Sequence, residues 1–338
     1  MNSFGRIFRL SIFGESHGEA VGILIDGCPA GLTLEAGDFL NDLERRKGGI
    51  QKGTTPRKED DIPFFKSGIF HGRTTGAPIG IFFENKNTRS EDYEKLRAVP
   101  RPGHADFVAH QKFGGLEDYR GGGHFSGRLT VCLVAAGVIA KKLLQLASPV
   151  NPIIVSAEIV EIGGEKDTEK GLQKAIDAKD SVGGIVECRV SHLPSGLGEP
   201  FFDSVESNLA HAALAIPAVR GIEFGTGFAA ARMFGSEHND AIETLEGKTR
   251  TNHAGGVVGG ITNGNELVFR IAIKPTSSTP KEQETLNWET GKQELFSVKG
   301  RHDLCIALRV PVILESIAAI VLADLLCVEQ RIPRVIHS

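Results

Sequence analysis

The stretch LTVCLVAAGVIAKKLLQL, residues 129–146, decides how this chain folds. Its side chains are apolar on most faces of a helix, and its only charges are Lys141 and Lys142. A helix that is apolar all round belongs in the interior of a protein. A second apolar stretch, residues 311–328, carries Glu315 and Asp324. Because charged residues interrupt both stretches, the sequence predicts two buried core helices rather than membrane spans.

Shorter segments with strand-like and helix-like patterns surround these two stretches. The predicted strands are residues 4–13, 20–27, 62–70, 77–84, 152–163, 183–192 and 266–274, and the predicted shorter helices are residues 35–46, 167–179 and 203–215. The polar, cation-rich residues 47–61 predict a mobile loop, and GRTTG at residues 72–76 predicts a turn. No repeat or long linker is visible, so we expect one α+β domain over residues 1–338, with sheets enclosing the buried helices.

Composition narrows the class of partner and the compartment. The net charge of −4 provides no basic field for nucleic acid, so we expect a small-molecule partner. The five cysteines are widely spaced and contain no CxxC pair, which argues against a zinc site and predicts buried thiols in a reducing cytosol. The N-terminal MNSFGR has no signal-peptide core, which also favours a cytoplasmic location without a membrane partner.

Two histidines lie in short frames bordered by glycine. These frames are GESHG at residues 14–18 and RPGHAD at residues 101–106. Glycine lets the backbone approach a ligand closely, and each frame has an acid that can orient the imidazole. Histidine is the side chain most easily adapted to proton transfer near neutral pH. With Arg101 beside the second histidine, the pair predicts an acid–base site that handles an anion.

Several other segments are rich in glycine, hydroxyls or cations. They are DYRGGGHFSGR at residues 118–128, NHAGGVVGG at 252–260, KPTSS at 274–278 and GRHD at 300–303. The first leads into the predicted central helix, where free backbone amides can bind an anion. Each motif alone is more often a structural turn. No GxGxxG fingerprint or GxxxxGK[ST] loop is present, which argues against Rossmann and P-loop sites.

Taken in order, seven segments resemble the chorismate synthase family over essentially the whole chain. The resemblance rests on FGESHG (13–18), DGCPAG (26–31), RPGHAD (101–106), DYRGGG (118–123), NHAGG (252–256), KPTSS (274–278) and GRHD (300–303). It implies a lyase of the shikimate pathway that converts 5-enolpyruvylshikimate-3-phosphate to chorismate and phosphate by a 1,4-anti elimination. It also implies a requirement for reduced FMN, a β-α-β sandwich of antiparallel sheets around central helices, and a homotetramer.

The resemblance assigns roles to individual residues. His104 matches the histidine that assists the departing phosphate, His17 the one that serves the reduced flavin, and Asp303 the carboxylate near flavin N5. The residues implied for flavin binding are His124, Phe125, Ser126, Pro217, Ala218, Gly259, Lys274, Pro275, Thr276, Ser277, Ser278 and Arg301. Arg46, Arg101 and Arg128 are expected to bind the anionic substrate. Arg46 and Lys52 fall at positions associated with NADPH, a candidate reductant, and an external flavin reductase is the alternative source of reduced flavin. No metal is expected.

The chain departs from the family pattern at three places near the expected site. RRKGG at residues 45–49 replaces Arg-Arg-x-Pro-Gly, His124 and Phe125 replace an arginine and a serine, and Leu304 replaces a proline. The change at His124 and Phe125 leaves a second function open, a non-catalytic protein that binds flavin or a phosphate ligand on the same fold. A histidine-based phosphohydrolase is a third, weaker alternative. Retention of His17, His104 and Asp303 favours the enzyme, because binding alone needs none of them.

Overall fold

In the computed structural model, residues 2–49, 52–55, 59–88, 97–298 and 302–337 are described. The helices are α1 (Leu40–Arg46), α2 (Asp106–Phe113), α3 (Thr130–Ala147), α4 (Thr168–Ala178), α5 (Val205–Ala213), α6 (Gly235–His238) and α7 (Pro311–Val328). The strands are β1 (Ser3–Phe4), β2 (Arg9–Gly14), β3 (Ala20–Asp26), β4 (Phe64–Ser67), β5 (Ile69–Phe70), β6 (Arg73–Thr74), β7 (Ile79–Glu84), β8 (Ile154–Ile162), β9 (Gly184–Ser191), β10 (Val219–Phe224), β11 (Val257–Val258), β12 (Ile261–Thr262), β13 (Leu267–Ile273), β14 (Gln283–Asn287) and β15 (Lys292–Phe296).

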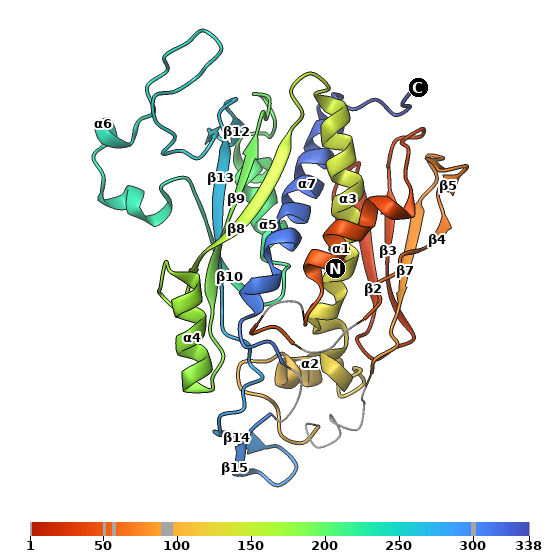
Figure 1. Cartoon of the computed structure of the whole chain (residues 1–338), viewed down its shortest axis with the longest axis vertical. Helices are drawn as coiled ribbons and strands as arrows, with labels where there is room; N and C mark the ends of the chain where they lie inside the picture. The colour runs from red at the N-terminus through yellow and green to blue at the C-terminus, as the bar shows by residue number, and fades with distance from the viewer. Residues whose placement is uncertain (1, 50–51, 56–58, 89–96, 299–301, 338) are drawn as a thin grey trace.

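Two antiparallel sheets enclose α3 and α7 (Figure 1). One sheet has the strand order β1-β2-β3-β7-β4 and the other has the order β10-β13-β9-β8. Helix α3 contacts β3 and β7, whereas α7 contacts β8 and β9. The predicted α+β class and the β-α-β sandwich of antiparallel sheets around central helices are therefore confirmed.

The two central helices bury nearly all of their side chains. Residues 127–147, which include α3, and helix α7 each contain an apolar stretch that is long enough to cross a membrane. Inside the protein, 78% of the first stretch and 89% of the second are buried. Gly137 of α3 faces Ser316 of α7 so closely that a Cβ at Gly137 would lie 2.3 Å from the Ser316 Cβ. A glycine in mid-helix costs helix stability, and here it permits the close approach of the two helices.

The sheets present one apolar face to these helices. Alternate residues of β3, Val21, Ile23 and Ile25, are fully buried, and alternate residues of β13 behave in the same way. This period of two is the geometry of a strand covered on one side. All five cysteines are free and buried, which confirms the prediction of buried thiols.

The predicted strand over residues 4–13 was wrong in its middle. Gly5 has a left-handed backbone (φ +92°), and the chain bends there before β2 begins. The backbone N–H groups of Arg6, Ile7 and Phe8 donate to the Asp324 carboxylate of α7 at 2.7–3.1 Å. These donors are thereby taken from the sheet, a long-range pairing that a local pattern does not reveal.

Other boundaries differ because short turns replace regular structure. The predicted turn at residues 72–76 contains β6, which pairs with β5 as a small hairpin that turns at residues 71–72. The predicted helix over residues 35–46 begins as a 3₁₀ turn, Ala36–Phe39, and only then becomes α1. Helix α2 and strands β10, β14 and β15 were not predicted, because their patterns are short and largely polar or interrupted.

Candidate active site

A cavity of about 560 Å³ lies where many of these elements begin or end. It is lined by Arg46 at the end of α1, His104 ahead of α2, Phe125 to Arg128 ahead of α3, residues 214–220 from just after α5 into the start of β10, residues 274–278 after β13, and Asp303 ahead of α7. This volume falls within the range of roughly 300–1,000 Å³ that is typical of small-molecule sites. Segments more than 250 residues apart in the sequence, such as those of Arg46 and Asp303, thus share one site.

His104 is held by a carboxylate two residues further along. Its Nδ1 lies 2.6 Å from Asp106 Oδ1, and we assign a proton to Nδ1 that is donated to this oxygen. Nε2 is then the nitrogen available for exchange with a ligand. A Cβ built at Gly122 would lie 3.4 Å from that Nε2, so the glycine turn keeps side chains away from it.

Asp106 is also clamped by Arg101. The Arg101 Nε donates to Asp106 Oδ2 at 2.7 Å, and Nη2 donates to Oδ1 at 2.8 Å. Burial raises the pKa of Asp106, but hydrogen bonds from Arg101 and His104 outweigh it, so this pKa lies well below its ordinary value. Asp106 is therefore a carboxylate throughout the physiological pH range. The Nη1 of Arg101 reaches Ser278 Oγ at 3.3 Å, which links this cluster to the turn after β13.

Asp303 uses both carboxylate oxygens. The backbone N–H of Thr55 donates to Oδ1 at 2.8 Å, and Arg309 Nη1 donates to Oδ2 at 3.0 Å. Arg309 in turn donates from Nε to the Arg46 carbonyl at 2.9 Å. Asp303 is thus fixed at the cavity wall by the loop after α1 and by the segment before α7. Each oxygen still has lone-pair capacity for a ligand.

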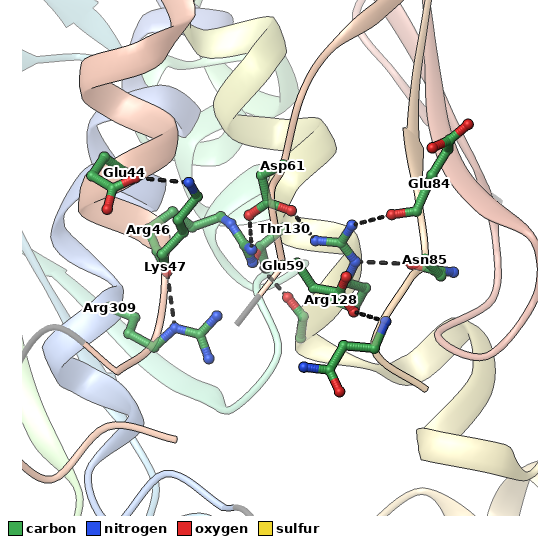
Figure 2. Close-up of polar contacts among 12 residues, drawn as sticks. Glu44, Arg46, Lys47, Glu59, Asp61, Glu84, Asn85, Arg128, Thr130 and Arg309 are labelled. Carbon is green, nitrogen blue, oxygen red and sulfur yellow. Dashed lines mark hydrogen bonds and ion pairs between the residues drawn. The ribbon is translucent and has the colours of Figure 1, made fainter. Parts of the chain in front are cut away.

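Arg46 and Arg128 share a single buried carboxylate, Asp61, which forms a bridge between them (Figure 2). Arg46 Nη2 donates to Asp61 Oδ2 at 2.6 Å, and Arg128 Nη1 donates to Asp61 Oδ1. Burial lowers the pKa of Arg46 to about 10, so its guanidinium keeps its charge at neutral pH. Both arginines line the cavity.

The KPTSS turn presents a cation and hydroxyls to the same cavity. Lys274 Nζ donates to Ser277 Oγ at 2.7 Å and to the Gly103 carbonyl at 3.1 Å. Burial lowers the pKa of Lys274, and the charge of Arg220 lowers it further. Thr276 Oγ1 is buried and has no hydrogen-bond partner among the described residues. A buried hydroxyl without a partner is costly, and a ligand oxygen would satisfy it.

Within the glycine-rich segment at residues 118–128, residues 124–126 lie in two different surroundings. Phe125 and Ser126 line the cavity, and the Ser126 hydroxyl accepts from the Arg128 N–H at 3.3 Å. His124 instead turns away, and its Nδ1 donates to the Gly14 carbonyl at 2.8 Å. It lines a separate, smaller apolar cavity of about 200 Å³. Of the two residues that depart from the family pattern here, Phe125 therefore lines the main cavity, whereas the imidazole of His124 does not.

His17 is buried behind the wall of the cavity rather than on it. Only 8% of its surface is exposed, and it is not among the residues that line the cavity. A Cβ built at Gly121 would lie 2.4 Å from the His17 ring, so the imidazole packs directly against this glycine. Gly121 itself lines the cavity. His17 thus lies one backbone away from the site.

Some of the other residues that were predicted to bind flavin or NADPH line the cavity, and others do not. Pro217 and Ala218 line the cavity, as do Pro275, Ser277 and Ser278. Gly259 lies in the turn between β11 and β12 and is not among the lining residues. Lys52 donates to Gln173 Oε1 of α4 at 3.0 Å and is also absent from the lining. Arg301 lies outside the described residues.

Sequence reasoning missed three charged residues of the site. Asp61 and Arg309 hold its ion pairs, and Arg220 lines it beside Lys274. Asp61 ends the cation-rich loop, and an acid in such a loop is a signal that could have suggested a partner for Arg46. Arg309 and Arg220 carry no local signal. Within the described part of the chain, no group of three His, Cys, Asp or Glu side chains is placed to hold a metal ion.

The arrangement defines an enzyme-like site for an anionic small molecule, in which a carboxylate-held histidine lies beside several guanidinium groups. Comparison with known proteins makes this class specific. The family model for chorismate synthase matches residues 8–327. A chorismate synthase from Chitinophaga pinensis is 70% identical over 338 residues and is covered completely, as is this chain. One from Dehalococcoides mccartyi is 44% identical over 366 residues, again with complete coverage of both chains.

A solved structure agrees with these relatives. A crystal structure of chorismate synthase superposes with a TM-score of 0.72 at 27% identity, covering 96% of this chain and 93% of the other. The chain belongs to the chorismate synthase family. Its function is that of a lyase in the shikimate pathway, which serves the biosynthesis of aromatic amino acids.

Proposed function

We propose that the 560 Å³ cavity is the active site, where 5-enolpyruvylshikimate-3-phosphate loses phosphate by a 1,4-anti elimination to give chorismate. The observation that carries this proposal is the meeting of His104, held by Asp106, with Arg46, Arg101 and Arg128 in one cavity. The substrate bears a phosphate and two carboxylates. Guanidinium groups bind such anions through paired, charge-assisted hydrogen bonds.

His104 is proposed to act on the leaving phosphate. With Nδ1–H directed to Asp106, the Asp106 carboxylate stabilises the protonated ring, and Nε2–H is the donor toward the cavity. Proton donation, or hydrogen bonding to the developing charge, makes phosphate a better leaving group. Asp106 is then a positioning residue and His104 is the catalytic one.

Asp303 is proposed to receive the proton that leaves carbon. Its position on the cavity wall, fixed by Thr55 and Arg309, supports this role because a base must be held near the C–H bond it breaks. His104 and Asp303 lie on different wall segments of one cavity. The two groups can therefore act on different parts of one substrate.

The lining residues also fit reduced FMN. Lys274 and the Thr276 hydroxyl, which has no partner in the described part of the chain, are suited to an anionic group, and Phe125 offers a flat apolar surface. Pro217 and Ala218 contribute further wall. Reduced FMN supplies the electron-rich ring on which elimination in this family depends. His17 is proposed to influence that ring from behind Gly121. Gly259, Arg301 and NADPH contacts by Arg46 and Lys52 stay predictions, as does the role of an external reductase.

A single catalytic domain over residues 1–338, assembled as a homotetramer in the cytoplasm, completes the proposal. Large apolar side chains exposed between β10 and β13 support assembly, since Phe228 is 81% and Phe234 77% exposed. The five free, buried cysteines are compatible with a reducing compartment.

The test is anaerobic incubation of the protein with substrate and reduced FMN, with phosphate release as the readout. We expect release that requires the flavin. His104→Ala and Asp303→Ala should lose far more turnover than flavin affinity, whereas His337→Ala, in the exposed C-terminal segment, should behave as wild type. Flavin binding without phosphate release would select the non-catalytic alternative, and release without flavin would select a phosphohydrolase.

A further inference from the structure

Asp61 combines two unusual features. Its side chain is completely buried, with 0% exposure, and its backbone has a left-handed φ of +52°. A buried carboxylate is costly unless it is paired, and a left-handed conformation is uncommon outside glycine. Residues with such features are frequent where a site must hold its groups in place. The neighbouring Asp60 is by contrast 68% exposed in its side chain.

Each oxygen of Asp61 serves a different arginine of the cavity (Figure 2). Oδ2 accepts from Arg46, at the end of α1, and Oδ1 accepts from Arg128, just ahead of α3. The guanidinium side chains are themselves only 3% and 4% exposed. Two like charges buried together repel each other, and the carboxylate between them offsets one of the two.

Arg128 is fixed further by its other nitrogens. Its Nε donates to Asn85 Oδ1 at 3.0 Å, and its Nη2 donates to the Glu84 carbonyl at 3.2 Å (Figure 2). The segment before Asp61 is tied to the same region, because Glu59 accepts from the Lys86 N–H at 3.2 Å. Asp61 is therefore anchored to the β7 end of the sheet.

Arg46 depends more heavily on Asp61. Its Nη1 reaches Thr130 Oγ1 only at 3.4 Å, and its Nε is buried without a partner among the described residues. The 2.6 Å bond to Asp61 is the short polar contact that holds its guanidinium. Loss of that carboxylate would leave Arg46 beside the charge of Arg128 with little to fix it.

We propose that Asp61 is a positioning residue that holds Arg46 and Arg128 as one unit for binding the anionic groups of the substrate. This rests on the proposed function of the cavity. Removing the Asp61 charge makes the cavity more positive, so simple electrostatics predicts tighter anion binding. Positioning predicts the reverse, because two unrestrained guanidinium groups separate and no longer converge on one anion. The sign of the effect therefore distinguishes the two.

The test uses the full-length Asp61→Asn variant, with Asp60→Asn as the matched exposed control. We expect KM for the substrate to rise roughly 10- to 100-fold, the range for loss of a charged hydrogen bond, with a smaller change in kcat. The dissociation constant for inorganic phosphate, measured by calorimetry, should rise in parallel. Asp60→Asn should match wild type. Unchanged or tighter binding in a folded Asp61→Asn variant would overturn the proposal.

Two further variants separate positioning from a purely structural role. Asp61→Glu keeps the charge and should recover part of the lost affinity. In a double-mutant cycle, Asp61→Asn together with Arg128→Gln should raise KM no more than the larger single change, because both act through one unit. Effects that multiply would show that Asp61 does not act through Arg128. Phosphate binding needs no turnover, so it tests Asp61 even if phosphate release by the wild type were to fail.

Discussion

Replacement of Asp106 by asparagine tests the link between the carboxylate and His104. Asparagine preserves the size of the side chain but removes the charge that stabilises a protonated imidazole. It also places an NH₂ group against Arg101, which donates three hydrogen bonds to this carboxylate at 2.7–3.1 Å. The contact between His104 Nδ1 and Asp106 Oδ1, at 2.6 Å, is the one that bears on catalysis.

The size of the effect follows from the strength of that contact. A hydrogen bond to a charged group contributes about 1.5–3 kcal/mol, and about 1.4 kcal/mol corresponds to tenfold in rate. We therefore expect kcat for Asp106→Asn to fall by between about tenfold and about 150-fold. KM should rise less, because Asp106 does not line the main cavity and Arg101 keeps its contact with Ser278.

The assay is steady-state phosphate release under anaerobic conditions, with thermal unfolding as the check on folding. Asp26→Asn is the matched control, since Asp26 at the end of β3 also pairs with an arginine, Arg9 at 2.7 Å, but both of these side chains are exposed. The double variant with His104→Ala should be no slower than His104→Ala alone. A folded Asp106→Asn variant whose kcat stays within about twofold of wild type would refute the reasoning.

Two other predictions concern the glycine turn and the acid limit of the fold. Gly121→Ala should lower activity at least about tenfold while leaving substrate KM less affected, because the new Cβ would lie 2.4 Å from the His17 ring and φ is +61°. Gly37→Ala is the control, since Gly37 has nothing within 4 Å and does not line the cavity, and equal activities of the two variants would contradict the prediction. Burial raises the pKa of Glu315, but Arg45 and Lys141 outweigh it, so the folded-state pKa lies below the ordinary 4.5. The stabilising effect of the ionised Glu315 is then complete above about pH 5 and is lost as pH falls. The free energies of unfolding of wild type and Glu315→Gln, measured by denaturant titration, should therefore converge in acid. A difference between these two free energies that does not change with pH would contradict the prediction.

The sequence predicted those parts of the fold whose cause is local. The apolar stretch in α3 needed no partner to be recognised, and neither did the alternation in β3 and β13. The bend after Gly5 could not be predicted, because its backbone donors are satisfied by Asp324, more than 300 residues away. Long-range hydrogen bonds of this kind override local preference without leaving a local pattern.

The same distinction applies to the site. Motif order predicted His104, Arg46, Arg101, Arg128 and Asp303 as site residues, and all five line one cavity. The carboxylate that pairs with two of these arginines, Asp61, is separated from Arg128 by 67 residues. His124 was expected beside the flavin but bonds to the Gly14 carbonyl instead. Which way a side chain turns at the end of a glycine turn depends on neighbours from other elements.

The ion pairs around the cavity have a common consequence for turnover. Arg46, Arg101, Arg128 and Arg309 face the carboxylates of Asp61, Asp106 and Asp303, which leaves one net positive charge among seven charged groups. Each guanidinium is thus held in position before an anion arrives, so little ordering is required on binding. Binding that is equal in substrate and transition state does not raise kcat, and only contacts that strengthen as the C–O bond breaks do so. In the proposed mechanism, the carboxylates therefore serve to fix the guanidinium groups that bind the substrate, and the hydrogen bond from His104 is the contact that strengthens as charge develops on the leaving oxygen.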